Sequence, residues 1–150
     1  MRKQNMLPIN VLFIAGFGPI TASPEKSQSL YIEVLNLPLK AMQGNETYLS
    51  SEQGEIGGVN HFAVWPLNQA SQSCFGVEHW PSNISIPQSW IEFEVDDIAK
   101  ASEEMLSKGY DLLVNNRVEP WGQSVTRFLS PEGMLIGLTV TPWLRSIEDK

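Results

Sequence analysis

The order of strand-like and helix-like segments occurs twice along this chain, and this limits the possible folds more than any other feature. Each half predicts a strand, then a helix, then further strands. The stretch 78–88, which proline and asparagine interrupt, separates the halves as a linker. We therefore predict an α+β fold of two βαβββ modules, at about 8–77 and 88–143, within one domain of 150 residues.

The second half carries the clearest signals. Residues 89–95 alternate as a strand does, and Asp97 supplies a carboxylate cap for a helix whose apolar side continues to Leu106. Gly109 ends that helix as a C-terminal cap. Three further strands are predicted over 111–114, 123–129 and 134–141, with a turn at 130–133.

The first half opens on a segment with two interpretations. Arg2 and Lys3 precede an apolar run over 6–20, which is the arrangement of an export signal. Proline, asparagine and glycine interrupt this run, and Ser23 then starts a helix predicted over 24–36. A strand that leads directly into a helix belongs to a folded domain, so we favour a first strand over 11–20. Further strands are predicted over 47–49 and 59–65, with a short helix or loop over 67–76.

The charge and cysteine content exclude several kinds of partner. A formal net charge of -7 disfavours nucleic acids and acidic lipid surfaces, because both bind basic patches. No apolar run is smooth and long enough to span a bilayer. The single cysteine, Cys74, has no partner for an internal disulfide, so nothing requires an oxidising compartment. We therefore expect a cytoplasmic protein with neither nucleic-acid nor membrane partners.

Four segments match the pattern of a known family in their residues and their spacing. They are Trp-Ile-Glu-Phe-Glu-Val-Asp-Asp at 90–97, Glu-Pro-Trp-Gly-Gln at 119–123, Ser-Pro-Glu-Gly-Met-Leu-Ile-Gly-Leu at 130–138, and Leu30-Tyr31 followed by Val34-Leu35-Asn36-Leu37. The chain resembles the vicinal oxygen chelate superfamily, which includes glyoxalase I, bleomycin-resistance proteins and extradiol dioxygenases. The resemblance implies two βαβββ modules that form a cupped eight-stranded mixed sheet around a cavity, with helices on the outer face. It also implies a homodimer.

The resemblance further implies where metal ligands would lie. Catalytic members of the superfamily hold one divalent metal with His and Glu side chains inside the cup, because such ions need several nitrogen and oxygen donors in fixed geometry. Three of these positions correspond here to Gly16, Trp90 and Gly137, which supply no metal donor. Only His61 lies near the fourth position. We therefore expect neither a metal nor another cofactor.

Alternation along the strands selects the side chains that would face the cup. Trp90 and Glu92 share one face of their strand, whereas the residues between them match the apolar face of the following helix. A carboxylate there would be poorly solvated, and its charge would need a nearby cation, such as Arg127, to stabilise it. That pair would be either a structural salt bridge or a polar anchor for a ligand. The candidate ligand-binding residues are His61, Trp65, Trp90, Glu92, Trp121, Arg127, Phe17 and Tyr48.

Aromatic side chains around the predicted cup favour ligand binding, because flat and rigid rings are suited to stacking on planar molecules. We therefore predict a metal-free protein that binds an apolar or aromatic small molecule for sequestration, resistance or sensing. One alternative is an enzyme, a lyase, isomerase or oxygenase, that uses a non-standard metal site or Glu92 as a base together with His61. A third possibility is a structural or dimerisation module whose own side chains fill the cup.

Overall fold

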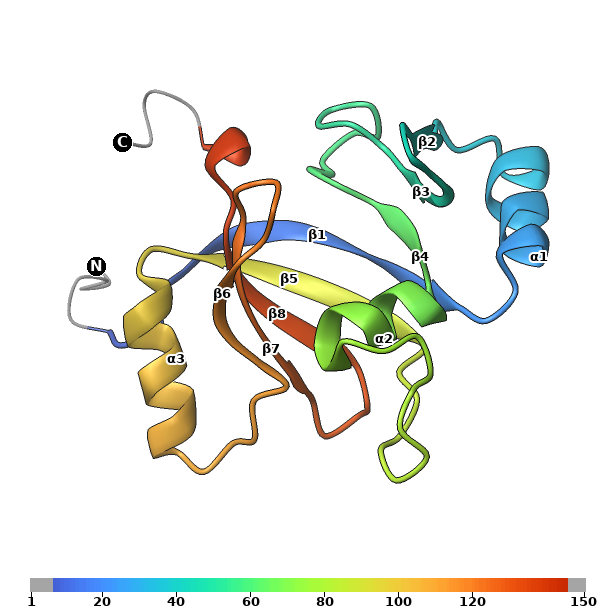
Figure 1. Cartoon of the computed structure of the whole chain (residues 1–150). Coiled ribbons are helices and arrows are strands. Elements are labelled where there is room, and N and C mark those ends of the chain that lie inside the picture. Colours follow the sequence, from blue (N-terminus) through green and yellow to red (C-terminus); the bar gives the residue numbers. More distant parts are fainter. Residues whose placement is uncertain (1–6, 146–150) are drawn as a thin grey trace.

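Eight strands form one mixed sheet, which confirms the fold class predicted from the sequence (Figure 1). The computed structural model describes residues 7–145. The strands are β1 (Val11–Thr21), β2 (Lys40–Met42), β3 (Asn45–Ser50), β4 (Ala63–Pro66), β5 (Ser89–Val95), β6 (Val114–Val118), β7 (Ser124–Leu129) and β8 (Leu135–Val140). They lie side by side in the order β2-β3-β4-β1-β5-β8-β7-β6.

The two halves of the chain join at β1 and β5, the central pair of the sheet. β1 runs antiparallel to β5, with Phe17 opposite Ile91 and Gly18 opposite Trp90. On its other side β1 is parallel to β4, just as β5 is parallel to β8. Each half therefore places its last strand beside its first strand and its second strand at an outer edge of the sheet. The segment 11–20 forms β1, the strand that the sequence predicts there.

The first helix covers the outer face of the first half. It begins as α1 (Pro24–Gln28), with proline at its first position, and continues as a π-helical segment, η2 (Ser29–Val34). Tyr31 and Ile32 of η2 pack against Leu49 of β3 and Val64 of β4. The helix predicted over 24–36 therefore forms over 24–34, with Tyr31 and Ile32 on the sheet.

A second outer helix, α3 (Ile98–Ser107), covers the other half. It begins after Asp97, whose Oδ1 accepts a hydrogen bond from the Lys100 amide at 3.0 Å, as the predicted cap requires. Ala101 and Met105 of α3 pack in one apolar cluster with Val95 of β5. None of the helices within residues 7–145 has the length and apolar character that crossing a membrane needs.

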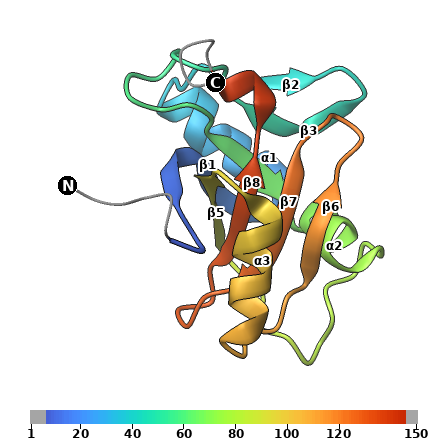
Figure 2. The same ribbon diagram turned by 90° about the vertical axis from the view of Figure 1, so that its left-hand side faces the viewer.

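A third helix, α2 (Leu67–Phe75), lies on the inner face of the sheet, opposite α3. Figure 1 shows the strands of the second half between α3 and α2, and Figure 2 shows α2 beyond β6 and β7 when the molecule is viewed from the side of α3. Ala70 and Cys74 of α2 pack against Trp90 and Leu135 of the sheet. The sequence predicts a helix or loop here, but it does not predict that the helix covers the inner face.

The two edge strands differ most from the sequence-based prediction. β2 is not predicted, and β6 lies further along the chain than the strand expected over 111–114. Every residue of β2 and four of the five residues of β6 are exposed. A strand that is exposed on both faces has no alternation of apolar and polar residues, so the pattern that identifies inner strands is missing.

The outer face of β1 keeps apolar side chains in contact with solvent. Val11, Ile14 and Phe17 are 37%, 47% and 38% exposed. The three lie on the outer face because their partners on β5 belong to the face that carries α3. The two outer helices therefore leave part of the central strand uncovered.

Candidate functional site

A row of four residues crosses the inner face of the sheet. Gly16 of β1 lies opposite Glu92 of β5, Glu92 lies beside Gly137 of β8, and Gly137 lies opposite Arg127 of β7. A Cβ atom on Gly137 would lie 2.9 Å from Cγ of Glu92, and one on Gly16 would lie 3.1 Å from Cη2 of Trp90. The two glycines therefore leave the space in which the side chains of Glu92 and Trp90 lie across the sheet.

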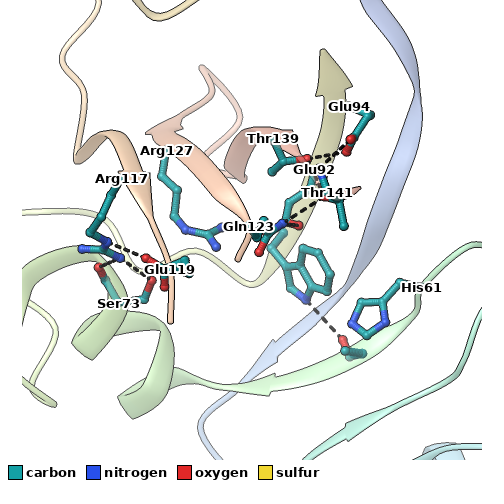
Figure 3. Close-up of polar contacts among 12 residues, drawn as sticks. His61, Ser73, Glu92, Glu94, Arg117, Glu119, Gln123, Arg127, Thr139 and Thr141 are labelled. Carbon is teal, nitrogen blue, oxygen red and sulfur yellow. Dashed lines mark hydrogen bonds and ion pairs between the residues drawn. The ribbon is translucent and has the colours of Figure 1, made fainter. Parts of the chain in front are cut away.

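Glu92 and Arg127 form a buried ion pair, in agreement with the expectation that Arg127 is the cation near Glu92 (Figure 3). Nη1 of Arg127 donates to Oε2 of Glu92 at 3.0 Å, and the two side chains are 12% exposed for Glu92 and 3% for Arg127. Nε2 of Gln123 donates to Oε1 of Glu92 at 2.9 Å. Both carboxylate oxygens thus accept a hydrogen bond, as a buried carboxylate requires. In this structure Glu92 is therefore the partner of both Arg127 and Gln123.

Two tryptophan side chains lie beside this ion pair. Trp65 and Trp90 pack edge to face, with their ring centroids 5.9 Å apart and their planes at 77°. Cζ of Arg127 lies over the Trp65 ring, 4.9 Å from its centroid, which is a cation–π geometry. Nε1 of Trp90 donates to the carbonyl oxygen of Ala63 at 3.2 Å. The guanidinium group and the two indole rings therefore form one packed group.

Tyr48 and His61 form a hydrogen-bonded pair next to Trp90. The Tyr48 hydroxyl lies 2.8 Å from Nε2 of His61, and Nδ1 of His61 lies 3.2 Å from the carbonyl oxygen of Ser51. Burial lowers the pKa of His61 and raises the pKa of Tyr48; the Glu92 carboxylate opposes the first shift and adds to the second. Both rings are therefore neutral at neutral pH. We assign the proton of His61 to Nδ1, which donates to Ser51, while Nε2 accepts from the Tyr48 hydroxyl.

The lowered pKa of His61 predicts that the protein loses stability as the pH falls below the ordinary histidine pKa of 6.5. The unfolded chain binds a proton there while the buried ring stays neutral, so acid favours the unfolded state. We expect the Tm to fall between about pH 7.5 and pH 5.5, and to fall less in His61→Gln, as thermal unfolding followed by circular dichroism would show. His79→Gln is the control, because His79 is exposed. An equal change in both variants would contradict the burial of His61 as the cause.

The helix α2 packs against Trp90 on the inner face of the sheet. Cys74 of α2 belongs to the same apolar cluster as Trp90, and burial raises the pKa of the Cys74 thiol. Arg117 of β6 connects the helix to the sheet, since its Nη2 donates to the carbonyl oxygen of Ser73 at 2.7 Å and to Oγ of Ser73 at 3.2 Å (Figure 3). The helix α2 therefore covers the part of the inner face around Trp90, whereas Tyr48, His61 and Trp65 are only partly buried.

Two adjoining hollows of about 390 Å³ and 430 Å³ open beside the first turn of α2. Leu67 and Ile86 line both of them. One hollow also reaches Trp80 and the other reaches Ile20, and these two residues share the apolar cluster of Trp90. The hollows therefore adjoin, at the start of α2, the apolar cluster that contains Trp90.

A second buried carboxylate, Glu94, lies on the inner face and was not selected by the sequence analysis. Its Oε1 accepts from the Thr139 hydroxyl at 2.9 Å, and its Oε2 accepts from the Thr141 amide at 2.6 Å and from Nε of Arg145 at 2.9 Å. Figure 3 shows Glu94 beside Thr139 and Thr141. Strand alternation puts Glu94 on the face of Glu92, but no sequence pattern connects it with Arg145, which follows the last strand.

Solved structures share this arrangement of strands and helices. A glyoxalase/bleomycin resistance protein/dioxygenase superfamily member from Vibrio splendidus 12B01 matches with a TM-score of 0.55 and 14% identity, over 89% of this chain and 99% of that chain. A variant of Streptomyces coelicolor methylmalonyl-CoA epimerase in complex with 2-nitronate-propionyl-CoA matches with a TM-score of 0.57 and 17% identity, over 91% and 99%. The chain has the vicinal oxygen chelate fold.

The vicinal oxygen chelate fold does not assign an activity by itself, because one fold can carry unrelated functions. NAD-dependent benzaldehyde dehydrogenase from Legionella pneumophila also matches, with a TM-score of 0.55 and 10% identity, over 83% of this chain and 96% of that chain. No protein-family model and no curated protein matches the sequence. The function is therefore argued from the site.

The metal site that the sequence resemblance associates with catalytic proteins of the vicinal oxygen chelate fold does not fit the residues present. Gly16, Trp90 and Gly137 occupy three of its positions and supply no metal donor. His61 lies nearby, but both of its ring nitrogens already have hydrogen-bond partners. Within residues 7–145, no group of three or more His, Cys, Asp or Glu side chains is placed to hold a metal ion.

Six of the eight candidate ligand-binding residues lie together on or beside the inner face: Tyr48, His61, Trp65, Trp90, Glu92 and Arg127. Trp121 lies at the rim, 57% exposed, and its Nε1 donates to Oε1 of Gln123 at 2.9 Å. The structure does not bring Phe17 to this face, because its ring packs against Phe62 on the outer side, with centroids 5.5 Å apart. A register shift between Ile14 and Gly16 reverses the alternation along β1.

Proposed function

We propose that the protein binds a small, planar and largely apolar molecule on the inner face of its sheet, without a metal ion, for sequestration, resistance or sensing. The observation that carries this proposal is the edge-to-face pair of Trp65 and Trp90 beside a guanidinium group whose charge Glu92 already balances. Such a surface offers aromatic contact and hydrogen-bond donors without net charge.

In this proposal a ligand reaches the inner face when α2 moves away from the sheet. α2 packs there through small side chains, including Ala70 and Cys74, and no side chain caps its first turn. The Ser71 hydroxyl is buried and has no hydrogen-bond partner within residues 7–145, which destabilises the closed state. The two hollows beside Leu67 adjoin the same helix. These features favour an opening at α2 over a separation of strands.

A fluorescence titration tests the proposal. Naphthalene derivatives should quench the tryptophan emission of the wild-type protein in a saturable manner. Trp65→Phe should weaken binding by about three- to tenfold, because an aromatic pair contributes roughly 0.5–1.5 kcal/mol. Trp143→Phe removes an exposed ring in η3 (Pro142–Leu144) and should leave the affinity unchanged. If the wild type shows no saturable quenching, its own side chains fill the inner face and the proposal fails. A divalent ion bound at one equivalent and lost on chelation would overturn the metal-independent part.

Removing the contact between Arg117 and Ser73 should speed the opening of α2. Arg117→Ala removes both hydrogen bonds to Ser73. We expect faster amide hydrogen exchange in α2 and faster ligand association, with unchanged exchange in β5 and β8, because the Arg117 side chain contacts Ser73 of α2 and Glu119 but neither of these two strands. Lys108→Ala is the control for the lost charge, since Lys108 pairs with Glu104 at an exposed site. Identical exchange of α2 in both variants would show that Arg117 does not hold the helix.

We also propose that the protein is a cytoplasmic homodimer of single-domain chains. Val11, Ile14 and Phe17 form an exposed apolar surface on the outer face of β1, which a second copy covers in the proposed dimer. The lone Cys74 needs no oxidising compartment. Light scattering measures the mass in solution, and the mass of a single chain would contradict the dimer.

A further inference from the structure

The guanidinium group of Arg127 has an unused edge. Within residues 7–145 its side chain donates one hydrogen bond, from Nη1 to Glu92, and its buried Nε has no acceptor. A guanidinium group is planar and carries five N–H donors in a fixed arrangement, in which Nε–H and one N–H of Nη2 point the same way. Arg127 therefore presents two parallel donors on the inner face without a protein acceptor.

The unused edge of the Arg127 guanidinium group has no hydrogen-bond acceptor among the described side chains. A buried donor without a partner costs roughly 1–3 kcal/mol, and more when it is charged. The two carboxylates of the inner face, Glu92 and Glu94, already accept hydrogen bonds on both oxygens. A bound molecule with a planar acceptor group can complete the edge, because two parallel N–H groups match one carbonyl oxygen or one carboxylate.

Charge balance decides between these two acceptors. Glu92 pairs with Arg127, and Glu94 pairs with Arg145, so the charges of the inner face already cancel. A carboxylate on the ligand would add a buried negative charge with no cation to balance it, which costs several kcal/mol. A carbonyl oxygen accepts both hydrogen bonds through its two lone pairs and adds no net charge.

We infer that the ligand is a neutral aromatic carbonyl compound, such as an aryl amide, an aryl ketone or a quinone. Its ring lies against Trp65 and Trp90, and its carbonyl oxygen accepts from Nε of Arg127. This inference rests on the proposed function and adds the chemical class of the ligand to it.

Three compounds with one ring system test the class. Naphthalene, naphthalene-2-carboxamide and naphthalene-2-carboxylate are titrated into the wild-type protein, and tryptophan quenching reports binding. The carboxamide should bind about tenfold or more tightly than naphthalene, because a hydrogen bond to a charged group contributes roughly 1.5–3 kcal/mol. It should also bind more tightly than the carboxylate, which carries the unbalanced charge.

Two substitutions test the roles of the ion pair. Glu92→Gln leaves the charge of Arg127 unbalanced, so the order should reverse and the carboxylate should bind more tightly than the carboxamide. Arg127→Lys removes the Nε edge, so the affinity ratio between carboxamide and naphthalene should fall towards one. Glu103→Gln changes an exposed acid on α3 and should keep the wild-type order. If Glu92→Gln does not fold, as judged by circular dichroism, the wild-type series and Arg127→Lys still decide.

The outcomes separate this inference from the function on which it rests. Equal affinity of the wild type for naphthalene and the carboxamide overturns the inference but leaves the proposed binding function intact. Tightest binding of the carboxylate by the wild type also overturns it, because the site then requires an anion. If none of the three compounds gives saturable quenching, the proposed function fails as well.

Discussion

Replacing Gly18 with alanine should lower the free energy of unfolding by more than about 4 kcal/mol, and overpacking against the backbone is one of the few causes of so large a loss. A Cβ atom at this position would lie 1.9 Å from the carbonyl oxygen of Ala63, which belongs to the backbone of β4. Neither strand can give way without loss of the pairing between β1 and β4. The same carbonyl accepts the Nε1–H of Trp90, so the shift would also disturb the inner face. Urea unfolding followed by circular dichroism measures the effect.

Gly57→Ala is the matched control for this substitution. No atom lies within 4 Å of a Cβ built on Gly57, and its backbone is not left-handed. Alanine should therefore be neutral there or stabilise the protein by about 0.4–1 kcal/mol, through the lower entropy of the unfolded chain. A Gly18→Ala protein as stable as Gly57→Ala would show that β1 and β4 do not approach each other so closely.

Replacing Arg127 with methionine should cost about 3–5 kcal/mol, because it leaves the buried carboxylate of Glu92 without its cation. Adding Glu92→Gln to this variant removes the unbalanced charge, and the double variant should recover more than half of the loss. The cycle of single and double variants therefore separates the cost of a lone buried charge from the value of the pair.

An exposed ion pair supplies the comparison for this cycle. At the surface, Nζ of Lys108 lies 3.8 Å from Oε2 of Glu104. Lys108→Met breaks this contact and should change the free energy of unfolding by less than about 0.5 kcal/mol. A similar small loss in Arg127→Met would mean that water reaches Glu92, contrary to the burial of this ion pair.

The inner strands and much of the candidate site could be predicted from the sequence. Side chains alternate between the two faces of a strand, so Trp90 and Glu92 are predicted to share the face of β5 that points away from the following helix. The structure shows this placement. The same rule brings Trp65 to the inner face. The ion pair between Glu92 and Arg127 could also be anticipated, because a carboxylate among indole rings needs a cation.

Other features depend on contacts that local patterns do not contain. The register shift in β1 moves Phe17 to the outer face, and the almost continuous apolar sequence of this strand does not reveal that its two faces are exchanged. The position of α2 depends on small residues such as Ala70, which suit packing against bulky rings but do not indicate which surface the helix meets. Arg145 lies 51 residues after Glu94 and directly follows η3. No local pattern in the sequence therefore indicates that the two side chains meet.

The central position of β1 has a consequence for the synthesis of the protein. Both of its neighbours, β4 and β5, come later in the chain, so β1 leaves the ribosome well before either partner strand exists. Its apolar side chains are then an unpaired segment that a chaperone can bind. The sheet cannot close until β5 has emerged, and a nascent chain that stops before that point has no completed core.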